Sequence, residues 1–360
     1  MINVTRSHLP SLEEYNDYLK KIWETRWLTN RGNYVQQLEK EICQKLNINH
    51  LLFVSNGTIA LQISIKSLGL KGEIITTPFS YVATTTSIIW ENCKPVFCDI
   101  NPVDFCIDPN KIEALITPDT SAILATHVFG IPCDVKLIEK IAKKHDLKVI
   151  YDGAHAFGVK LEGKSIFEYG DISTCSFHAT KVFHTIEGGS ITCNIPELRD
   201  GLFKQHTFGH IGDEYYSLGI NGKNSEFHAA MGLCNIKVID QIIEGRKKVF
   251  KTYDKLLQHD YLQRPLLNDN VDYNYSYYPI VFKNENMLLT AKENLHRNQI
   301  NTRRYFFPSL NNLPYLATKQ SCPISEDISR RVLCLPLYPD LEMNTIEKIA
   351  DTINNIIEHV

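Results

Sequence analysis

Residues 121–155 read SAILATHVFGIPCDVKLIEKIAKKHDLKVIYDGAH, the pattern of a strand, a helix and a second strand. The runs 121–130 and 147–155 begin with short apolar stretches, which predict strands. Between them, residues 134–145 place apolar side chains at helical spacing, and Asp134 is a predicted cap for the first turn. Strands that are apolar throughout and alternate with helices predict a mostly parallel sheet with both faces covered.

The same alternation continues on both sides of this stretch. Further strands are expected at 50–58, 73–80, 173–181 and 189–194, and helices at 34–46 and 59–70. Ligands of such α/β sheets bind beyond the carboxyl ends of the strands. Polar residues gather at just those places, at 55–58, 78–81 and 152–155. The functional site is therefore expected at that edge of the sheet.

The character of the chain changes after about residue 235. A long helical pattern spans 234–258 and is followed by an apolar strand at 275–282 and a helix at 286–300. A short strand at 301–307 and an amphipathic helix at 344–360 complete the pattern. We therefore predict a large domain at 1–235 and a smaller C-terminal α+β domain at 236–360.

Composition restricts the kinds of partner. The 360 residues carry a net charge of −3, which gives no reason to expect nucleic acid or an anionic membrane. No apolar run reaches the ~18 residues of a membrane span, and the N-terminus lacks the apolar core of a signal peptide. The ten cysteines form no Cys-x-x-Cys pair, so no metal site or disulfide framework is expected. They indicate reduced thiols in a cytoplasmic protein.

Lys181 is the only lysine in CSFHATKVFHTIEGGS, residues 175–190. Apolar and aromatic neighbours surround it, and burial lowers the pKa of a lysine amine. A neutral amine is a nucleophile suited to Schiff-base chemistry. The alternative is an ordinary lysine whose stem lies on apolar surface while its charge reaches water.

Two further patterns point to a phosphorylated, aromatic cofactor. Asp152 ends a buried strand, where a carboxylate is suited to keep the ring nitrogen of pyridoxal phosphate protonated; a turn or helix cap is the alternative. In SNGT, residues 55–58, the helix start at Thr58 offers backbone N–H groups to a phosphate, or is a plain capped helix.

Three weaker signals accompany them. Tyr81 is suited to stack on a flat ring, or belongs to the core. Gly188 and Gly189 allow close approach of the backbone. The Gly-rich loop that opens 219–232 is long enough to reach a neighbouring subunit, or is a simple loop before a helix. No dinucleotide-binding, zinc-protease or serine-hydrolase motif occurs.

Taken in order, these segments resemble the pyridoxal-phosphate-dependent sugar-nucleotide aminotransferases of the DegT/DnrJ/EryC1/StrS family. The resemblance covers nearly the whole chain, and its segments include RWLTNRGNYVQQLEKEI (26–42), VSNGTIAL (54–61), TTPFSYVAT (76–84), YDGAHAFG (151–158), SFHATK (176–181), GINGKNSEFHAAMG (219–232) and LPLYPDL (335–341). It implies the type I aminotransferase fold and a homodimer with shared active sites.

The resemblance also implies roles for individual residues. Lys181 matches the lysine that carries the cofactor covalently, and Asp152 matches the partner of the ring nitrogen. His155 matches a position beside the ring oxygen. The remaining matches are Gly57, Thr58 and Ser176 for the phosphate, Tyr81 for ring stacking, and Asn221 for the phosphate of the partner subunit's cofactor. Gly153 and Asn224 depart from the residues that are frequent in the family.

The implied reaction moves an amino group from L-glutamate to a nucleotide-linked keto sugar. Relatives that act as dehydratases replace the lysine by histidine, so Lys181 favours amino transfer. The pattern is most similar to enzymes that aminate C4 of dTDP-4-dehydro-6-deoxy-D-glucose for surface polysaccharide such as O-antigen. Amination at C3 of a dTDP-3-keto-6-deoxyhexose is the alternative, and a non-catalytic regulatory or binding protein is a third hypothesis.

Two segments are candidates for contact with the sugar nucleotide. One lies near the N-terminus and includes Thr29 and Asn30; the other is the loop from Arg303 to Pro308, which includes Arg304 and Tyr305. For Arg304 and Tyr305 a solvated strand edge is an equally good interpretation.

Overall fold

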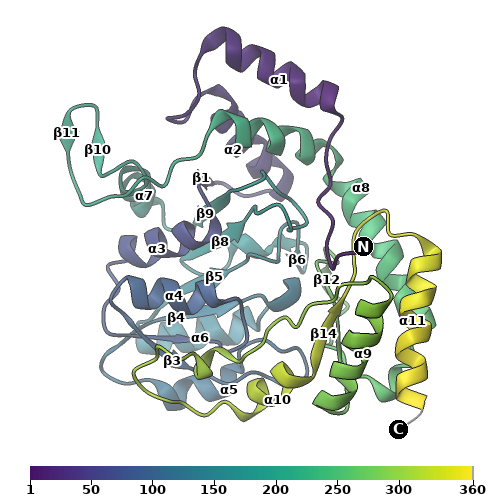
Figure 1. Cartoon of the computed structure of the whole chain (residues 1–360). Coiled ribbons are helices and arrows are strands. Elements are labelled where there is room, and N and C mark those ends of the chain that lie inside the picture. Colours follow the sequence, from purple (N-terminus) through teal and green to yellow (C-terminus); the bar gives the residue numbers. More distant parts are fainter. Residues whose placement is uncertain (359–360) are drawn as a thin grey trace.

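The predicted strand–helix–strand unit is present in the computed structural model, which describes residues 1–358 apart from the side chain at 259 (Figure 1). It consists of β4 (Thr120–Thr126), α6 (Val135–His145) and β5 (Lys148–Asp152). Asp134 caps α6, since its Oδ1 accepts a hydrogen bond from the backbone N–H of Leu137 at 3.0 Å. β4 and β5 are parallel, with Thr126 opposite Asp152.

Within residues 1–358, seven strands form the large sheet in the order β1-β9-β8-β5-β4-β2-β3. The strands not yet given are β1 (Leu52–Val54), β2 (Glu73–Thr76), β3 (Lys94–Phe97), β8 (Ile172–Ser176) and β9 (Gly189–Cys193). β9 is antiparallel to β1 and β8, and the other pairings are parallel. The expectation of a mostly parallel, mixed sheet is therefore confirmed. The edge strand β3 was not among the predicted strands.

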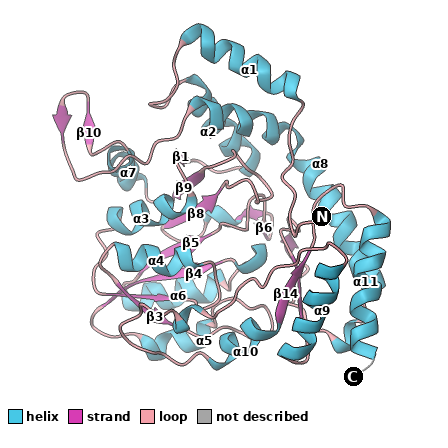
Figure 2. Cartoon of the chain, viewed as in Figure 1, coloured by secondary structure: helices cyan, strands magenta, loops and turns pink. Residues whose placement is uncertain are grey.

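Helices cover both faces of this sheet (Figure 2). They are α3 (Gly57–Ser67) and α4 (Val82–Trp90) on one face, and α2 (Asn33–Leu46), α6 and the first part of α8 (Glu226–Leu256) on the other. Successive strand residues alternate between these layers: Ile74 and Leu124 pack with α3 and α4, whereas Ile75 and Ile123 pack with the opposite layer. Burial on both faces explains why the strands read as continuous apolar runs.

The C-terminal part of the chain builds a second core around α8. The second half of α8 packs with a two-stranded sheet and two helices: β13 (Tyr278–Val281), β14 (Val332–Leu335), α9 (Glu285–Arg297) and α11 (Met343–Glu358). Leu233 of α8 belongs to the first core and Val249 to the second. The predicted domain boundary at 235/236 therefore falls inside one continuous helix, and it stays a prediction.

Several local expectations differ from the structure. Residues 301–307 form no strand, because Arg303 makes one isolated bridge to Cys334 and the chain then turns at residues 305–306. β8 ends at Ser176, because residues 177–181 turn away. Helix α1 (Leu12–Thr25) was not predicted. The last helix runs to Glu358, and the two residues beyond it lie outside the described part.

A small hairpin projects from the body of the molecule beside α7 (Arg199–His206) (Figure 1). It comprises β10 (His210–Ile211) and β11 (Glu214–Tyr215). Its large apolar side chains are exposed, namely Phe208, Ile211, Tyr215, Tyr216 and Leu218. The ten cysteines are all free. None of the helices within residues 1–358 is both long and apolar enough to cross a membrane.

Candidate active site

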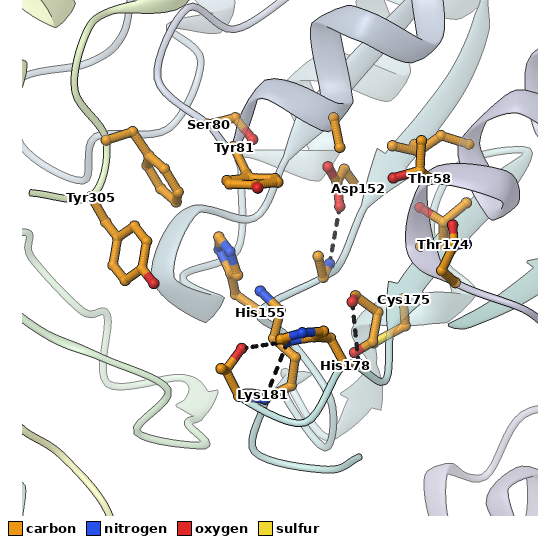
Figure 3. Close-up of a pocket in the computed structure, with 18 of the residues that line it drawn as sticks. Thr58, Ser80, Tyr81, Asp152, His155, Thr174, Cys175, His178, Lys181 and Tyr305 are labelled. Atoms are coloured by element: carbon orange, nitrogen blue, oxygen red, sulfur yellow. Dashed lines mark hydrogen bonds between the residues drawn. The ribbon is translucent and has the colours of Figure 1, made fainter. Parts of the chain in front are cut away.

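A cavity of about 670 Å³ opens at the carboxyl-end edge of the large sheet (Figure 3). Its volume lies in the range of roughly 300–1,000 Å³ that is usual for small-molecule sites. The segments that follow β1, β2, β5 and β8 line it. In Figure 3, Tyr305 lies on one side of the cavity, and Thr58 and Thr174 lie on the opposite side. This is the edge at which the sequence predicted the site.

Lys181 lies in the loop between β8 and β9, where its backbone N–H donates to the carbonyl of His178 at 2.9 Å. Its side chain opens into the cavity and is otherwise enclosed by protein. Burial lowers the pKa of the Lys181 amine, and the carboxylate of Asp152 partly offsets this effect. The neutral, nucleophilic amine is therefore more abundant near pH 7 than on an exposed lysine.

Asp152 ends β5 and is only 5% exposed. Its Oδ2 accepts a hydrogen bond from the Thr84 hydroxyl at 2.8 Å, and its Oδ1 accepts one from the backbone N–H of Ala154 at 3.1 Å. A carboxylate has about four acceptor positions, so these two contacts orient the group and leave capacity for another donor. A donor that enters the cavity can reach it.

His155 is buried on the loop that follows β5, three residues after Asp152. Its Nδ1 accepts a hydrogen bond from the backbone N–H of Phe129 at 3.2 Å, so the proton of the neutral ring is on Nε2. Burial, and then the charge of Lys181, hold the pKa of His155 well below its usual value. The ring stacks on Phe306 with centroids 5.6 Å apart. His155 is therefore a fixed, neutral hydrogen-bond donor.

The N-terminus of α3 meets the end of β8. Asn56 caps the helix by accepting a hydrogen bond from the N–H of Ile59 at 2.9 Å. Within residues 1–358, no acceptor is found for the backbone N–H groups of Gly57 and Thr58. A Cβ on Gly57 would lie 3.0 Å from that of Ser176, so glycine keeps this corner open. Free N–H groups at a helix start favour an anion.

These residues fit pyridoxal phosphate. The corner of α3 and Ser176 suits its phosphate, and the unused acceptor positions of Asp152 suit a protonated ring nitrogen. Tyr81 is 55% exposed as a residue and lines the cavity, where its ring is free to stack on a flat group. Gly189 contributes to the same corner, since a Cβ there would lie 2.5 Å from the carbonyl carbon of Asn56. The predicted close approach at the glycine pair is thus confirmed.

The structure brings most of the sequence-predicted site residues together. Those that line the cavity are Gly57, Thr58, Tyr81, Asp152, His155, Ser176, Lys181 and Tyr305. Thr29 and Asn30 are exposed on the loop between α1 and α2, outside the lining. Asn221 is also exposed and outside it, and pairs through its backbone with Thr207.

Arg304 differs from the expectation. Its Nη2 donates to Glu285 Oε1 at 2.7 Å, and its guanidinium lies over the ring of Phe307. The arginine that lines the cavity is its neighbour Arg303, for which no ion pair is found within residues 1–358. Because adjacent residues of an extended segment point to opposite sides, only one of the two can face the cavity.

Two residues of the site were not singled out from the sequence: the buried Thr84, which lies behind Asp152, and Tyr277, which lines the cavity. Thr84 orients Asp152 and lies one helical turn after Tyr81, so its helical spacing was a usable signal. Tyr277 lies in an aromatic run that looks like core, so no sequence motif marks it as a site residue. In the structure its hydroxyl lies 3.4 Å from Nζ of Lys181.

A mostly parallel sheet with a lysine, an acid and an anion-binding helix start at its carboxyl edge defines the type I class of pyridoxal-phosphate enzymes. Comparison with known proteins gives the family within that class. The chain belongs to the DegT/DnrJ/EryC1/StrS aminotransferase family, whose model matches residues 11–354. The resemblance inferred from the sequence is thereby confirmed.

Similar proteins cover the chain almost completely. The dTDP-4-amino-4,6-dideoxy-D-glucose transaminase of Shigella dysenteriae is 41% identical over 363 residues, 99% of each chain. The protein of the same name from Escherichia coli is 40% identical over 366 residues, 97% of each chain. Among solved structures, DesI in the presence of its TDP-sugar product superposes with a TM-score of 0.92 at 28% identity, over 99% of this chain and 93% of that one.

Proposed function

We propose that the protein uses pyridoxal phosphate to transfer the amino group of L-glutamate to C4 of dTDP-4-dehydro-6-deoxy-D-glucose. The product would be dTDP-4-amino-4,6-dideoxy-D-glucose, a precursor of surface polysaccharide such as O-antigen. The observation that carries the proposal is the enclosed Lys181 amine beside Asp152 in one cavity. The 41% identity to a transaminase named for this product supports the sugar.

Each proposed role follows from the chemistry of the residue. The cofactor supplies a protonated ring that accepts electrons from a carbon that loses a proton. Asp152 would hold the proton on the ring nitrogen, and Gly57, Thr58 and Ser176 would bind the phosphate. Lys181 would bind the cofactor and, as a free amine, accept and return a proton at Nζ. The neutral His155 would donate a hydrogen bond from Nε2.

Both proposed substrates are anions, and the mouth of the cavity offers a cation. Arg303 lines it, with its guanidinium 5.3 Å from the centre of the Tyr305 ring. An arginine suits the carboxylate of a donor or the diphosphate of a nucleotide, because its N–H groups form paired hydrogen bonds. Thr29, Asn30 and Tyr305 stay candidates for the sugar nucleotide, whereas Arg304, which pairs with Glu285, is replaced in this role by Arg303.

Product analysis tests the substrate. The purified protein is incubated with dTDP-4-dehydro-6-deoxy-D-glucose, L-glutamate and pyridoxal phosphate, and the product is examined by NMR. We expect an amine at C4. A product aminated only when a dTDP-3-keto-6-deoxyhexose is supplied would establish the C3 alternative, and no turnover with either sugar would refute the proposal.

The non-catalytic alternative makes a different prediction for Lys181. One similar protein, at 33% identity, is a pleiotropic regulatory protein of Geobacillus stearothermophilus. If the chain is an enzyme of the proposed kind, added pyridoxal phosphate produces a near-visible absorbance band that Lys181→Ala abolishes. An absorbance spectrum that is the same in both proteins would favour a regulatory or binding role.

A cytoplasmic homodimer completes the proposal. The projecting hairpin exposes Phe208, Tyr215 and Leu218, and Asn221 follows it without facing its own cavity. Both observations support an arrangement in which Asn221 reaches the cofactor phosphate of a second copy. Sedimentation velocity tests it: a monomer at micromolar concentration in the presence of cofactor would contradict the role of Asn221.

A further inference from the structure

Tyr277 is the one hydrogen-bond partner that residues 1–358 provide for Nζ of Lys181. It directly precedes β13 and comes from a segment 96 residues further along the chain. The Nζ···Oη distance is 3.4 Å, and the amine is the donor. The Tyr277 ring also meets the ring of His155 edge-on, with centroids 5.1 Å apart. Tyr277 therefore touches two of the residues that define the site.

The segment that carries Tyr277 is held rigidly. The buried guanidinium of Arg246, on α8, donates to the carbonyls of Tyr275 and Ser276 at 2.9 and 2.6 Å. Asn274 donates to the carbonyl of His155 at 2.8 Å. A buried arginine is costly unless its donors are used, so these bonds fix the backbone that directly precedes the tyrosine.

We propose that Tyr277 is the positioning residue of Lys181, and that its hydroxyl holds Nζ toward the cavity whenever that nitrogen is a free amine. This inference rests on the proposed function, in which the lysine alternates between a cofactor-bound and a free state. A lysine side chain has four rotatable bonds. Unless a partner holds it, a free amine therefore samples orientations that do not point toward the cavity.

The hydroxyl of Tyr277 suits both protonation states of the Lys181 amine. It accepts an N–H of the ammonium ion, and it can donate to the neutral amine or accept from it. Burial raises the pKa of Tyr277, which keeps the group a neutral phenol. A neutral acceptor holds the amine without fixing it as an ammonium ion, whereas a carboxylate at that place would favour the charged form.

The test removes the hydroxyl and leaves the ring. Tyr277→Phe is compared with wild type and with Tyr253→Phe, which deletes a buried hydroxyl bonded to the carbonyl of Pro336 in the second core. The rate at which the cofactor-free protein reacts with pyridoxal phosphate is followed by absorbance across pH. The titratable groups that face Lys181, besides Tyr277, are Tyr81, Asp152, His155, Cys175 and Tyr305, and all variants retain them.

For Tyr277→Phe we expect the rate at its alkaline plateau to fall about tenfold, as for loss of one hydrogen bond. The midpoint of the rate profile should move to lower pH, because the oxygen that accepts from the ammonium ion is gone. In turnover, kcat should fall while KM for the sugar nucleotide is retained. Tyr253→Phe should leave the plateau and the midpoint as in wild type.

Three outcomes would overturn the inference: an unchanged plateau, an unchanged midpoint, or equal effects of the two variants. If Tyr277→Phe does not fold, 3-fluorotyrosine at position 277 replaces it. Fluorine changes both the acidity of the hydroxyl and its strength as an acceptor, so the midpoint must still move, and an unmoved midpoint would overturn the inference as well. A wild-type protein that never reacts with pyridoxal phosphate would instead refute the proposed function.

Discussion

The amine of Lys181 lies among groups that shift its protonation in opposite directions. Burial favours the neutral form, and the carboxylate of Asp152, the largest opposing influence, favours the ammonium ion. The net effect is a lowered pKa. At the scale of the residue, the fraction of neutral, reactive Lys181 amine therefore depends mainly on the balance between desolvation and the charge of Asp152.

Neutralising Asp152 should tip this balance. In Asp152→Asn the opposing charge is gone, so the pKa of Lys181 falls further, by about one pH unit for the loss of a nearby opposite charge. The measurement is the pH dependence of the rate at which the cofactor-free protein reacts with pyridoxal phosphate, whose midpoint should move to lower pH. Glu187→Gln is the control, since Glu187 lines the cavity 3.5 Å from His178 and does not contact Lys181. A midpoint that moves equally in both variants would contradict the explanation.

At the scale of the element, the N-terminus of α3 satisfies two structural requirements. It must begin a helix immediately after β1, and it must leave the N–H groups of Gly57 and Thr58 for a ligand. Asn56 allows both, because its side chain takes the N–H of Ile59 instead. The cap thus satisfies the N–H of Ile59 within the protein and holds the first turn so that the N–H groups of Gly57 and Thr58 stay available to the anion.

Asn56→Ala should therefore have a double effect. The loss of a helix cap costs about 1 kcal/mol of unfolding free energy. It should also weaken the binding of pyridoxal phosphate, because the first turn of α3 frays. Asp134→Ala is the matched control: it removes the cap of α6, whose hydrogen bond to Leu137 N is 3.0 Å, away from the cavity. Urea unfolding should give similar losses for both variants, whereas titration with cofactor should separate them. Equal affinities would show that the cap has no part in binding.

At the scale of the whole molecule, sequence pattern predicts the sheet and one side of the site. The alternation of doubly buried strands and helices requires a parallel sheet, and parallel strands bring Thr58, Asp152 and the Lys181 loop to one edge. The antiparallel insertion of β9 and the edge strand β3 do not follow from local pattern, because pairing order depends on contacts between distant segments.

The other side of the site could not be predicted in the same way. Tyr277 and Arg303 come from the C-terminal part of the chain, and they reach the cavity because that part packs against the first core. The choice between Arg303 and Arg304 depends on the register of a single bridge to Cys334, which neighbouring side chains in the sequence do not specify. From the sequence alone, Arg303 and Arg304 are equally good candidates for the position that faces the cavity.

Buried and partly buried histidines with lowered pKa values occur at several places around the large sheet. His50 accepts a hydrogen bond from the N–H of Cys193 at 3.3 Å, and burial lowers its pKa to about 4. Burial also lowers the pKa of His206 to about 4 and that of His155 well below the usual value. These rings pack or accept hydrogen bonds in their neutral form, so the folded protein resists protonation that the unfolded chain accepts.

The sign of the pH effect follows directly. Unfolded histidines bind protons below about pH 6.5, and the folded pKa values are lower. The unfolded state therefore binds more protons as pH falls from about 6.5 to 4, and the unfolding free energy should decrease by up to about 1.4 kcal/mol per pH unit for each such histidine. His50→Gln keeps an acceptor for Cys193 N–H without taking up a proton, so urea unfolding should show a shallower pH slope. His296→Gln, at an exposed position on α9, should keep the wild-type slope. If His50→Gln also kept the wild-type slope, His50 would make no contribution to acid destabilisation, and the slope would have to arise from His155, His206 or carboxylates.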